Sequence, residues 1–344
     1  MTETSARPHT LDAGALGAWM DEKGLPGSGT PTLAPLTGGS QNELYKVSRG
    51  GAESVLRMAP NGAAESRIDG VRREIRLLRA LKGTDVPHAE LVEGCDEADV
   101  LGGPFMLMKV VDGWSPVGLG GWPAPFDTDL SKRRGLAIEL VDGIAKLSRV
   151  DWKARGLEGF GRPENFHERQ VDRWLAFLDD YRFRDLPHLD EGAQWLRAHK
   201  PASWSPGIMH GDYQFANVMF ANGDQAKLAA IIDWEMTTVG DPLLDLGWAL
   251  ISWPPEGDDM TQYLDLTGMP PREELLAHYE RVSGRSTADI DYYVVLARWK
   301  LAVVLEKSFA AFSKGDAVDP KVEAFGPLIL DLLRKAAELA EKTG

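Results

Sequence analysis

The sequence has a single cysteine and no long hydrophobic run among its 344 residues. One cysteine, Cys95, excludes a disulfide within the chain and any cluster of thiolate metal ligands. No stretch of about 18 apolar residues is present, so we expect no membrane-spanning helix. The N-terminal residues lack the apolar segment of a secretory signal, and a cytoplasmic protein is therefore expected.

An excess of positive charge is also missing, because the formal net charge at pH 7 is −14. Proteins that bind the nucleic acid backbone need clustered Lys and Arg, which argues against nucleic acid as a partner. Acidic residues outnumber basic ones both before and after residue 108. This even distribution indicates general solubility rather than a binding site for a polycation. The sequence does not indicate an oligomeric state.

The pattern of apolar residues predicts an α+β protein with two lobes. Short apolar runs separated by Gly-containing turns predict antiparallel strands in the N-terminal part. These runs cover residues 31–36, 43–47, 53–58 and 103–110. Helical periodicity between residues 70 and 83 predicts one helix beside this sheet.

Residues 112–127 are rich in Gly and Pro and predict a junction between the lobes. Beyond them the chain shows mainly helical periodicity, and only residues 207–233 return to a strand pattern. We therefore expect a small sheet lobe at 1–108, a hinge and junction at 109–127, and a large helical lobe at 128–344.

The segment HGDYQFANVMF begins at His210 and places Asp212 and Asn217 between two short apolar runs. An Asn-Gly turn at 222–223 predicts a hairpin that carries Asp233 back toward Asn217. A carboxylate and an amide oxygen suit Mg²⁺, which prefers oxygen ligands and shares them with substrate phosphates. Asp212 is then left to accept a proton from an attacking hydroxyl.

These residues, together with IIDWE at 231–235, resemble the catalytic and metal loops of the aminoglycoside phosphotransferase and choline kinase-like families. Those families have a bilobal protein kinase-like fold. The resemblance implies a phosphotransferase that uses ATP or GTP with Mg²⁺ and acts on a small-molecule hydroxyl. It assigns Asp212 as the catalytic base, Asn217 and Asp233 as magnesium ligands, and His210 as structural support of the loop.

The resemblance also assigns the N-terminal lobe to nucleotide binding. The segment LTGGSQNELYKV lies between two predicted strands, and Gly38, Gly39 and Ser40 allow its backbone to approach phosphates closely. Arg57 stands on the strand where kinase-like proteins usually carry a phosphate-contacting Lys. An Arg keeps the positive charge and can bind phosphate through two parallel hydrogen bonds, although the alternative is an exposed Arg on an edge strand.

Glu74 falls on the inward stripe of the helix predicted at 70–83, between Val71 and Leu78. A buried carboxylate needs a partner, and Arg57 on the neighbouring strand is the expected one. In kinase-like folds such an ion pair directs the cation toward phosphate. The alternative is a peripheral Glu74 paired with Arg73 or another Arg of the same helix.

Asp241 and Asp245 lie in the segment VGDPLLDLGWALISW at 239–253. This pattern predicts a helix with Asp241 as N-cap and Pro242 as its first residue. Asp245 is a lone carboxylate inside that apolar helix. The resemblance implies that it supports the catalytic loop by hydrogen bonds.

The segments VLRM, GGPFMLMKVVDG and DWEMTTVGDPLLDLGW resemble more closely the kinase-like domains associated with acyl-CoA dehydrogenases. This resemblance implies a hydroxyacyl-CoA-like acceptor. The uncharged junction with Trp114, Trp122 and Phe126 suits an apolar acceptor if it lines the cleft, but it could equally pack the junction.

Three alternatives remain open at this point. The first is a kinase for aminoglycosides or amino alcohols. The second, from another class, is a metal-dependent phosphohydrolase with His210, Asp212 and Asp233 as ligands. The third is a nucleotide-binding pseudokinase, which the Arg at position 57 leaves possible. Magnesium-dependent nucleotide turnover with an acceptor distinguishes phosphoryl transfer from the other two classes.

Overall fold

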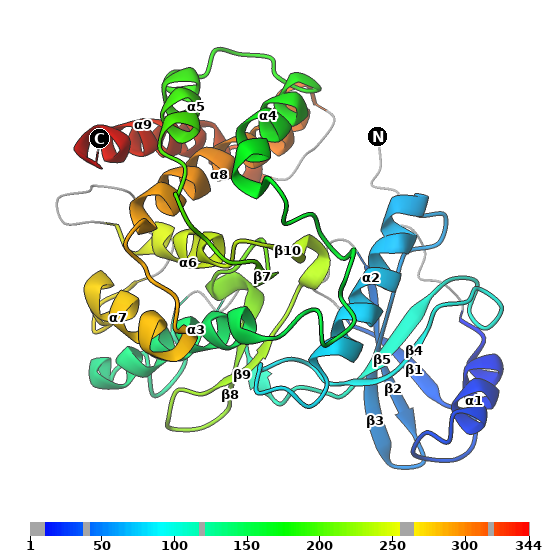
Figure 1. Ribbon diagram of the computed structural model, residues 1–344. Coiled ribbons are helices and arrows are strands. Elements are labelled where there is room, and N and C mark those ends of the chain that lie inside the picture. Colours follow the sequence, from blue (N-terminus) through cyan, green and yellow to red (C-terminus); the bar gives the residue numbers. More distant parts are fainter. Residues whose placement is uncertain (1–10, 37–41, 117–120, 255–264, 316–319, 344) are drawn as a thin grey trace. The chain divides into compact units, whose positions relative to one another are not determined.

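The computed structural model describes residues 11–36, 42–116, 121–254, 265–315 and 320–343 (Figure 1). The chain forms two compact units. The first comprises Met1–Gly113 together with Lys153–Leu157 and Ala229–Glu235, and the second comprises Trp114–Trp152, Glu158–Leu228 and Met236–Gly344.

The first unit contains an antiparallel sheet with the strand order β1-β2-β3-β5-β4. Its strands are β1 (Thr32–Pro35), β2 (Glu43–Arg49), β3 (Ala52–Met58), β4 (Leu91–Cys95) and β5 (Phe105–Met108). The strands β1, β2, β3 and β5 match the sequence prediction, whereas β4 was not predicted. On β3, Arg57 is in register with Leu44 on one side and Met106 on the other. Arg57 therefore lies on an interior strand of this sheet and not on an edge strand.

Two helices pack on this sheet, one more than the sequence predicts. The predicted helix is α2 (Glu65–Leu81). It begins before the predicted residue 70, and the sequence did not indicate this start because the first turn is polar and carries little apolar periodicity. The additional helix is α1 (Ala13–Glu22), whose N-cap Asp12 accepts a hydrogen bond from the Ala15 backbone N–H at 2.9 Å.

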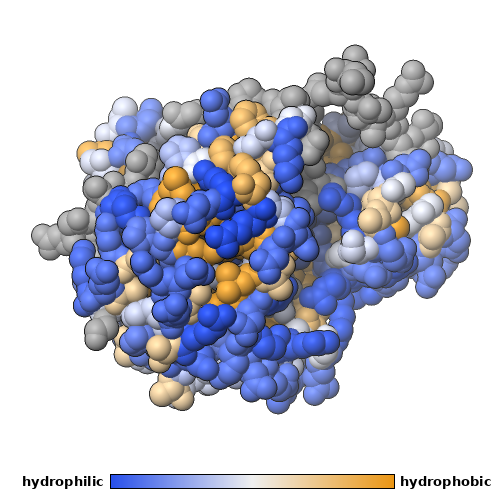
Figure 2. Space-filling view, turned by 90° about the horizontal axis from the view of Figure 1, so that it is seen from above, coloured by the Kyte–Doolittle hydropathy of each residue, from blue (hydrophilic) through white to orange (hydrophobic). Residues whose placement is uncertain are grey.

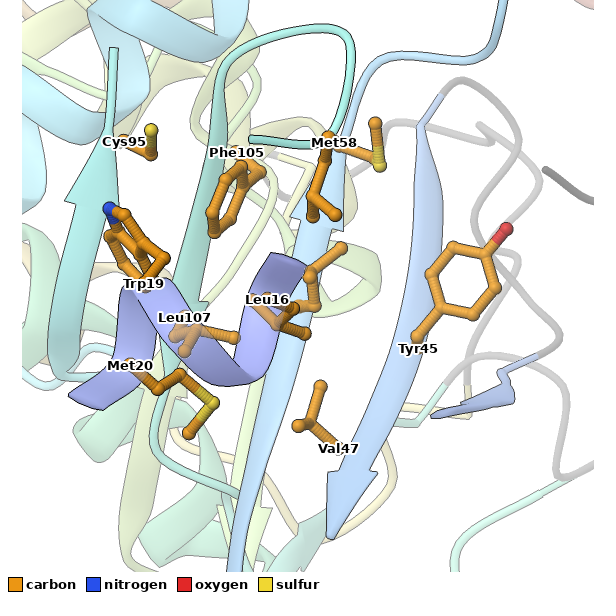
Figure 3. Packing of buried hydrophobic residues seen from close by; sticks show 11 residues of the cluster. Leu16, Trp19, Met20, Tyr45, Val47, Met58, Cys95, Phe105 and Leu107 are labelled. Atoms are coloured by element: carbon orange, nitrogen blue, oxygen red, sulfur yellow. The ribbon is translucent and has the colours of Figure 1, made fainter. Parts of the chain in front are cut away.

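The apolar core of the first unit lies between α1 and the sheet (Figure 3). Trp19 of α1 packs edge-on against Phe105 of β5, with ring centroids 4.8 Å apart. Cys95 belongs to the same cluster, while its neighbour Gly94 points to the other face, where a Cβ would lie 2.5 Å from Ile75 of α2. Alternation along β4 thus lets the two helices cover opposite faces of one sheet.

The second unit is mainly helical (Figure 1). Its α-helices are α3 (Leu130–Arg149), α4 (Phe166–Asp179), α5 (Leu189–Ala198), α6 (Leu243–Ala249), α7 (Arg272–Ser283), α8 (Ile290–Ser313) and α9 (Phe325–Thr343). The long helix α8 is central, since it packs against α4, α5, α6 and α9. This central position explains its nearly continuous apolar sequence, because a helix with neighbours on several sides has no wide polar face.

Short strands bracket the sequence motif. The strands β7 (Gly207–Met209) and β10 (Thr238–Gly240) pair in antiparallel fashion, with Ile208 opposite Val239. The strand β8 (Val218–Ala221) follows the motif. The division between the two units falls within β6 (Gly113–Trp114) and β9 (Leu228–Ile231).

The helix after β10 begins one residue later than the sequence predicts. Leu243 is the first residue of α6 and Pro242, not Asp241, occupies the cap position, with φ −62° and ψ −19°. Pro242 has helical dihedral angles, and its carbonyl accepts a hydrogen bond from the Asp245 N–H at 3.1 Å. The Asp241 carboxylate still accepts from the Leu243 N–H at 3.2 Å, so the acidic side chain satisfies a helix-terminal donor as expected.

The aromatic residues of the junction contribute to packing inside the second unit. Trp122 and Phe126 are buried. The Trp122 ring lies edge-on to Phe215 at 5.3 Å, and Trp114 stacks on Phe220 at 5.2 Å. Of the two interpretations of these aromatic residues, packing of the junction accounts for their positions. They therefore give no support for an apolar acceptor.

The surface is mostly hydrophilic on the face shown in Figure 2. Within the part of the chain that the structure describes, no helix combines the length and the apolar composition needed to cross a membrane.

Candidate active site

The motif that begins at His210 forms the loop between β7 and β8. A short 3-10 helix, η1 (Phe215–Asn217), ends the loop directly before β8. Two buried aromatic residues fix the loop to the second unit: Phe215 packs in the core, and the Tyr213 hydroxyl donates to the Leu140 carbonyl at 2.7 Å. The polar residues of the loop are thus attached to a rigid base.

Both oxygens of the Asp212 carboxylate accept hydrogen bonds within this loop. Gln214 Nε2 donates to Oδ1 and Asn217 Nδ2 donates to Oδ2, each at 2.8 Å. Asn217 Nδ2 also lies 2.8 Å from the Asp212 backbone oxygen. These bonds use the amide nitrogen, so the amide oxygen is the atom that Asn217 can offer to a cation. The sequence analysis did not single out Gln214, whose contribution depends on the local fold of the loop.

The turn before Asp212 is held by Asp245 of α6. Its two carboxylate oxygens accept from the backbone N–H groups of His210 and Gly211, the second at 2.8 Å. Burial raises the pKa of Asp245, while the His210 side chain and the two N–H donors lower it. The structure thus contains the hydrogen bonds from Asp245 to the loop that the resemblance implies.

His210 is fully buried and its ring Nδ1 accepts from the Asp212 backbone N–H at 3.3 Å. Its neighbour Gly211 has a φ of +91°, a left-handed conformation, and a Cβ at this position would lie 2.5 Å from the Met236 carbonyl oxygen. A side chain at position 211 is therefore excluded by both conformation and space.

Lys300 of α8 also contacts the turn, which the sequence analysis did not predict. Its Nζ donates to the Gly211 carbonyl at 3.2 Å and lies 5.0 Å and 4.6 Å from the ring centroids of Trp174 and Trp248. Burial lowers the pKa of Lys300 to about 8, although Asp212 and Asp245 counteract this effect. The available signal was the position of Lys300 within the largely apolar run VVLARWKLAVV, where it and Arg298 are the charged residues.

Asp241 is fully buried behind the loop. Its Oδ2 lies 2.9 Å from His167 Nε2 and accepts from the Tyr293 hydroxyl at 2.6 Å. These contacts connect the start of α6 to α4 and α8. That Asp241 serves as structural support of the site stays a prediction.

In the first unit, Arg57 and Glu74 form the ion pair that the sequence predicts. Arg57 Nε lies 3.0 Å from Glu74 Oε2, in ionic contact rather than a well-directed hydrogen bond. Glu74 is only 4% exposed, which excludes the peripheral alternative. Burial raises the pKa of Glu74 to about 7; Arg57 lowers it, and the carboxylates of Asp233 and Glu235 raise it further.

Asp233 belongs to the same unit as this pair. Arg57 Nη2 lies 3.7 Å from Asp233 Oδ1, so one guanidinium contacts two carboxylates. The segment before Asp233 is attached to the unit by the Ile231 N–H, which donates to the Pro87 carbonyl at 3.0 Å. Asp233 itself has a φ of +64°, a conformation that is uncommon outside glycine and that often marks functional sites.

The structure thus brings together two groups of predicted residues. His210, Asp212, Asn217 and Asp245 meet in the second unit, and Arg57, Glu74 and Asp233 meet in the first. That Asn217 and Asp233 bind one magnesium ion stays a prediction. Gly38, Gly39 and Ser40, predicted to cover the nucleotide, lie outside the described residues.

Comparison with known proteins relates the chain to phosphotransferases. Residues 32–289 match the model of the phosphotransferase enzyme family, APH. Acyl-CoA dehydrogenase family member 11 of Gallus gallus is 27% identical, with a match covering 99% of this chain and 45% of that protein. Acyl-CoA dehydrogenase family member 10 of Mus musculus is 25% identical, with coverage of 94% and 31%. The chain thus spans less than half the length of these curated relatives.

Among solved structures, a Ralstonia eutropha protein provisionally described as an aminoglycoside phosphotransferase superposes with a TM-score of 0.82. It is 28% identical, and the match covers 96% of this chain and 99% of that one. Aminoglycoside phosphotransferase APH(4)-Ia in complex with AMP-PNP and hygromycin B has the same fold, with a TM-score of 0.59, 15% identity and coverage of 93% and 98%. The matched family model covers most of the chain and includes every residue of both groups described above. The chain therefore belongs to the phosphotransferase enzyme family, the small-molecule phosphotransferases with the α+β protein kinase-like fold.

Proposed function

We propose that this protein transfers the γ-phosphoryl group of ATP or GTP, with Mg²⁺, to a hydroxyl group of a hydroxyacyl-CoA-like acceptor. Asp212 accepts the hydroxyl proton while the acceptor oxygen forms its bond to the γ-phosphorus. The bond between the γ-phosphorus and the bridging oxygen breaks, and the nucleoside diphosphate leaves. The products are a phosphate monoester and a diphosphate, with the proton on Asp212.

The observation that carries the proposal is the double anchoring of Asp212. Gln214 and Asn217 each donate to one carboxylate oxygen at 2.8 Å. A carboxylate held at both oxygens has one orientation, which is what a base requires when it must meet a hydroxyl in a fixed geometry. The loop backbone beneath it is held as well, by Asp245.

The donor set fits magnesium. Asn217 offers an amide oxygen and Asp233 a carboxylate, and Mg²⁺ typically takes few protein ligands because it keeps waters and phosphate oxygens. Magnesium, when bound, neutralises charge on the β- and γ-phosphates. Arg57, aimed by Glu74, supplies a further positive charge for phosphate on the first unit.

The acyl-CoA part of the proposal depends on the curated relatives, which are named as acyl-CoA dehydrogenase family members. We take the acyl-CoA in these names as the guide to the acceptor, and the proposed hydroxyl therefore belongs to a related acyl thioester. APH(4)-Ia, in contrast, was crystallised with hygromycin B, and an aminoglycoside is accordingly the second candidate acceptor.

The proposal is tested by nucleotide turnover with a panel of acceptors. The panel contains hydroxyacyl-CoAs of several chain lengths, aminoglycosides, choline-like amino alcohols and sugars, each with Mg-ATP or Mg-GTP. We expect acceptor-dependent diphosphate release with a hydroxyacyl-CoA and a new phosphate monoester signal in ³¹P NMR. The Asp212→Asn variant is the matched control for contaminating kinases.

The alternatives give different results in the same assay. Hydrolysis of a phosphate ester without transfer to an acceptor indicates a phosphohydrolase. Magnesium-nucleotide binding without turnover, for every acceptor, indicates a pseudokinase. Efficient phosphorylation of an aminoglycoside, with none of hydroxyacyl-CoAs, overturns the acceptor and leaves the kinase assignment in place.

A further inference from the structure

We propose that Lys300 is a positioning residue for phosphoryl transfer, which fixes the peptide group that carries Asp212. The proposal rests on the function proposed above. Lys300 lies in the middle of α8 and is 4% exposed. Its Nζ donates to the Gly211 carbonyl at 3.2 Å.

The Gly211 carbonyl and the Asp212 N–H belong to the same peptide group. Lys300 binds the oxygen of this group, and His210 Nδ1 accepts from its N–H at 3.3 Å. The preceding N–H groups, of His210 and Gly211, are bound by Asp245. Together with the contacts of Asp245 and His210, the Lys300 contact restricts rotation of the peptide groups that lead to Asp212.

Burial opposes a charge on Lys300, and the faces of two indole rings offset part of that cost. Its ammonium group lies between the rings of Trp174 and Trp248, at 5.0 Å and 4.6 Å from their centroids. Asp212 and Asp245 favour the charged form, whereas burial and the nearby Arg173 oppose it. An apolar side chain of similar length would fill this space without the desolvation penalty. Stability alone therefore does not explain a lysine at this position, whereas anchoring of the loop does.

The strength of this contact depends on the charge of Lys300. A charged ammonium donor makes a stronger hydrogen bond to the Gly211 carbonyl than a neutral amine does. Because the pKa of Lys300 is about 8, this charge is lost in mildly alkaline solution. Activity is thus expected to fall as the pH rises through about 8.

The test compares Lys300→Met and Lys300→Arg with Lys307→Met. Lys307 is the matched control because it is an exposed lysine on the same helix, next to Phe177 at 5.2 Å. For Lys300→Met we expect kcat to fall about 10- to 100-fold, because misplacement of a reacting group by about 1 Å can cost about 100-fold. The nucleotide KM and the unfolding temperature should change little, and Lys307→Met should retain wild-type kcat.

The pH profile separates positioning from general packing. Lys300→Arg keeps its charge in alkaline solution, so its activity should no longer fall as the pH rises through about 8. A kcat of Lys300→Met within twofold of wild type overturns the proposal, and so does an unchanged alkaline limb in Lys300→Arg.

Two measurements do not depend on activity and therefore separate this proposal from the proposed function. In NMR of protein labelled at lysine ¹³Cε, the Lys300 signal, identified by its loss in Lys300→Arg, should titrate at lower pH in Asp212→Asn. In hydrogen exchange, the backbone N–H groups of residues 207–218 should exchange faster in Lys300→Met than in Lys307→Met. If neither effect is seen, Lys300 does not hold the loop, whatever the acceptor proves to be.

Discussion

Arg57 of β3 and Glu74 of α2 form a buried ion pair, with Nε and Oε2 3.0 Å apart. The Glu74 side chain is almost fully buried, while the Arg57 side chain is 14% exposed and its Nη2 also lies 3.7 Å from Asp233 Oδ1. One carboxylate thus orients the cation, and the other is a proposed magnesium ligand. This arrangement suits a cation that must be held in one direction to meet phosphate oxygens.

The pair should act as a unit in catalysis. Arg57→Met and Glu74→Gln should each lower kcat/KM for the nucleotide, and the double variant should lose little more than the worse single variant. The physical reason is that Arg57 contacts phosphate productively only when Glu74 aims it. The measurement is a double-mutant cycle on kcat/KM, and fully additive losses would mean that the two side chains act separately.

Replacement of Asp212 by Asn should lower kcat by about 100- to 10,000-fold, since loss of a general base has effects of this size. Asn keeps the volume and can keep the contact with Gln214, so the nucleotide affinity should stay within a few-fold. Steady-state kinetics and calorimetry with Mg-AMP-PNP check both parts. Near-normal turnover in this variant would exclude Asp212 as the base.

Asp233→Ala should have a different signature, because it removes a proposed metal ligand. Binding of the Mg-nucleotide and turnover should weaken together, and the magnesium concentration needed for half-maximal activity should rise. Asn217→Ala should show the same effects more mildly in binding, with an additional loss of kcat because Asn217 also holds Asp212. Unchanged nucleotide affinity in calorimetry with Mg²⁺ would contradict the assignment of Asp233.

Much of this fold is predictable because its signals are local. The short apolar run at 53–58 and the inward place of Glu74 on a helix identify both partners of the ion pair from the sequence alone. The sequence did not predict α1 or β4, for a physical reason. Their apolar faces are short and are completed only by contacts with distant strands, as Trp19 is by Phe105.

The polar residues of the candidate site and the support from Asp245 were predicted, but the contacts made by Gln214 and Lys300 were not. Asp212 and Asn217 follow from spacing along one loop. Gln214 and Lys300, in contrast, act through contacts that depend on how the loop and α8 fold. A charged residue within an apolar helix is noticeable in the sequence for Lys300 as it is for Asp245. Periodicity alone, however, cannot identify the carbonyl to which Lys300 donates.

The stability of the protein should depend on pH through Glu74. The pKa of Glu74 is about 7 in the folded protein and has the ordinary value of 4.5 when the side chain is exposed. Between pH 4.5 and 7 the folded state therefore binds more protons than the unfolded state does. The free energy of unfolding should therefore decrease as the pH rises from about 4.5 to 7, and this contribution should be constant above that range. The total decrease is at most about 3 kcal/mol.

Glu74→Gln cannot titrate and should lack this decrease, whereas Glu65→Gln, at an exposed site on the same helix, should retain it. The comparison is made by urea unfolding at several pH values without nucleotide, and parallel curves for the wild type and Glu74→Gln would show that Glu74 is ionised throughout this range.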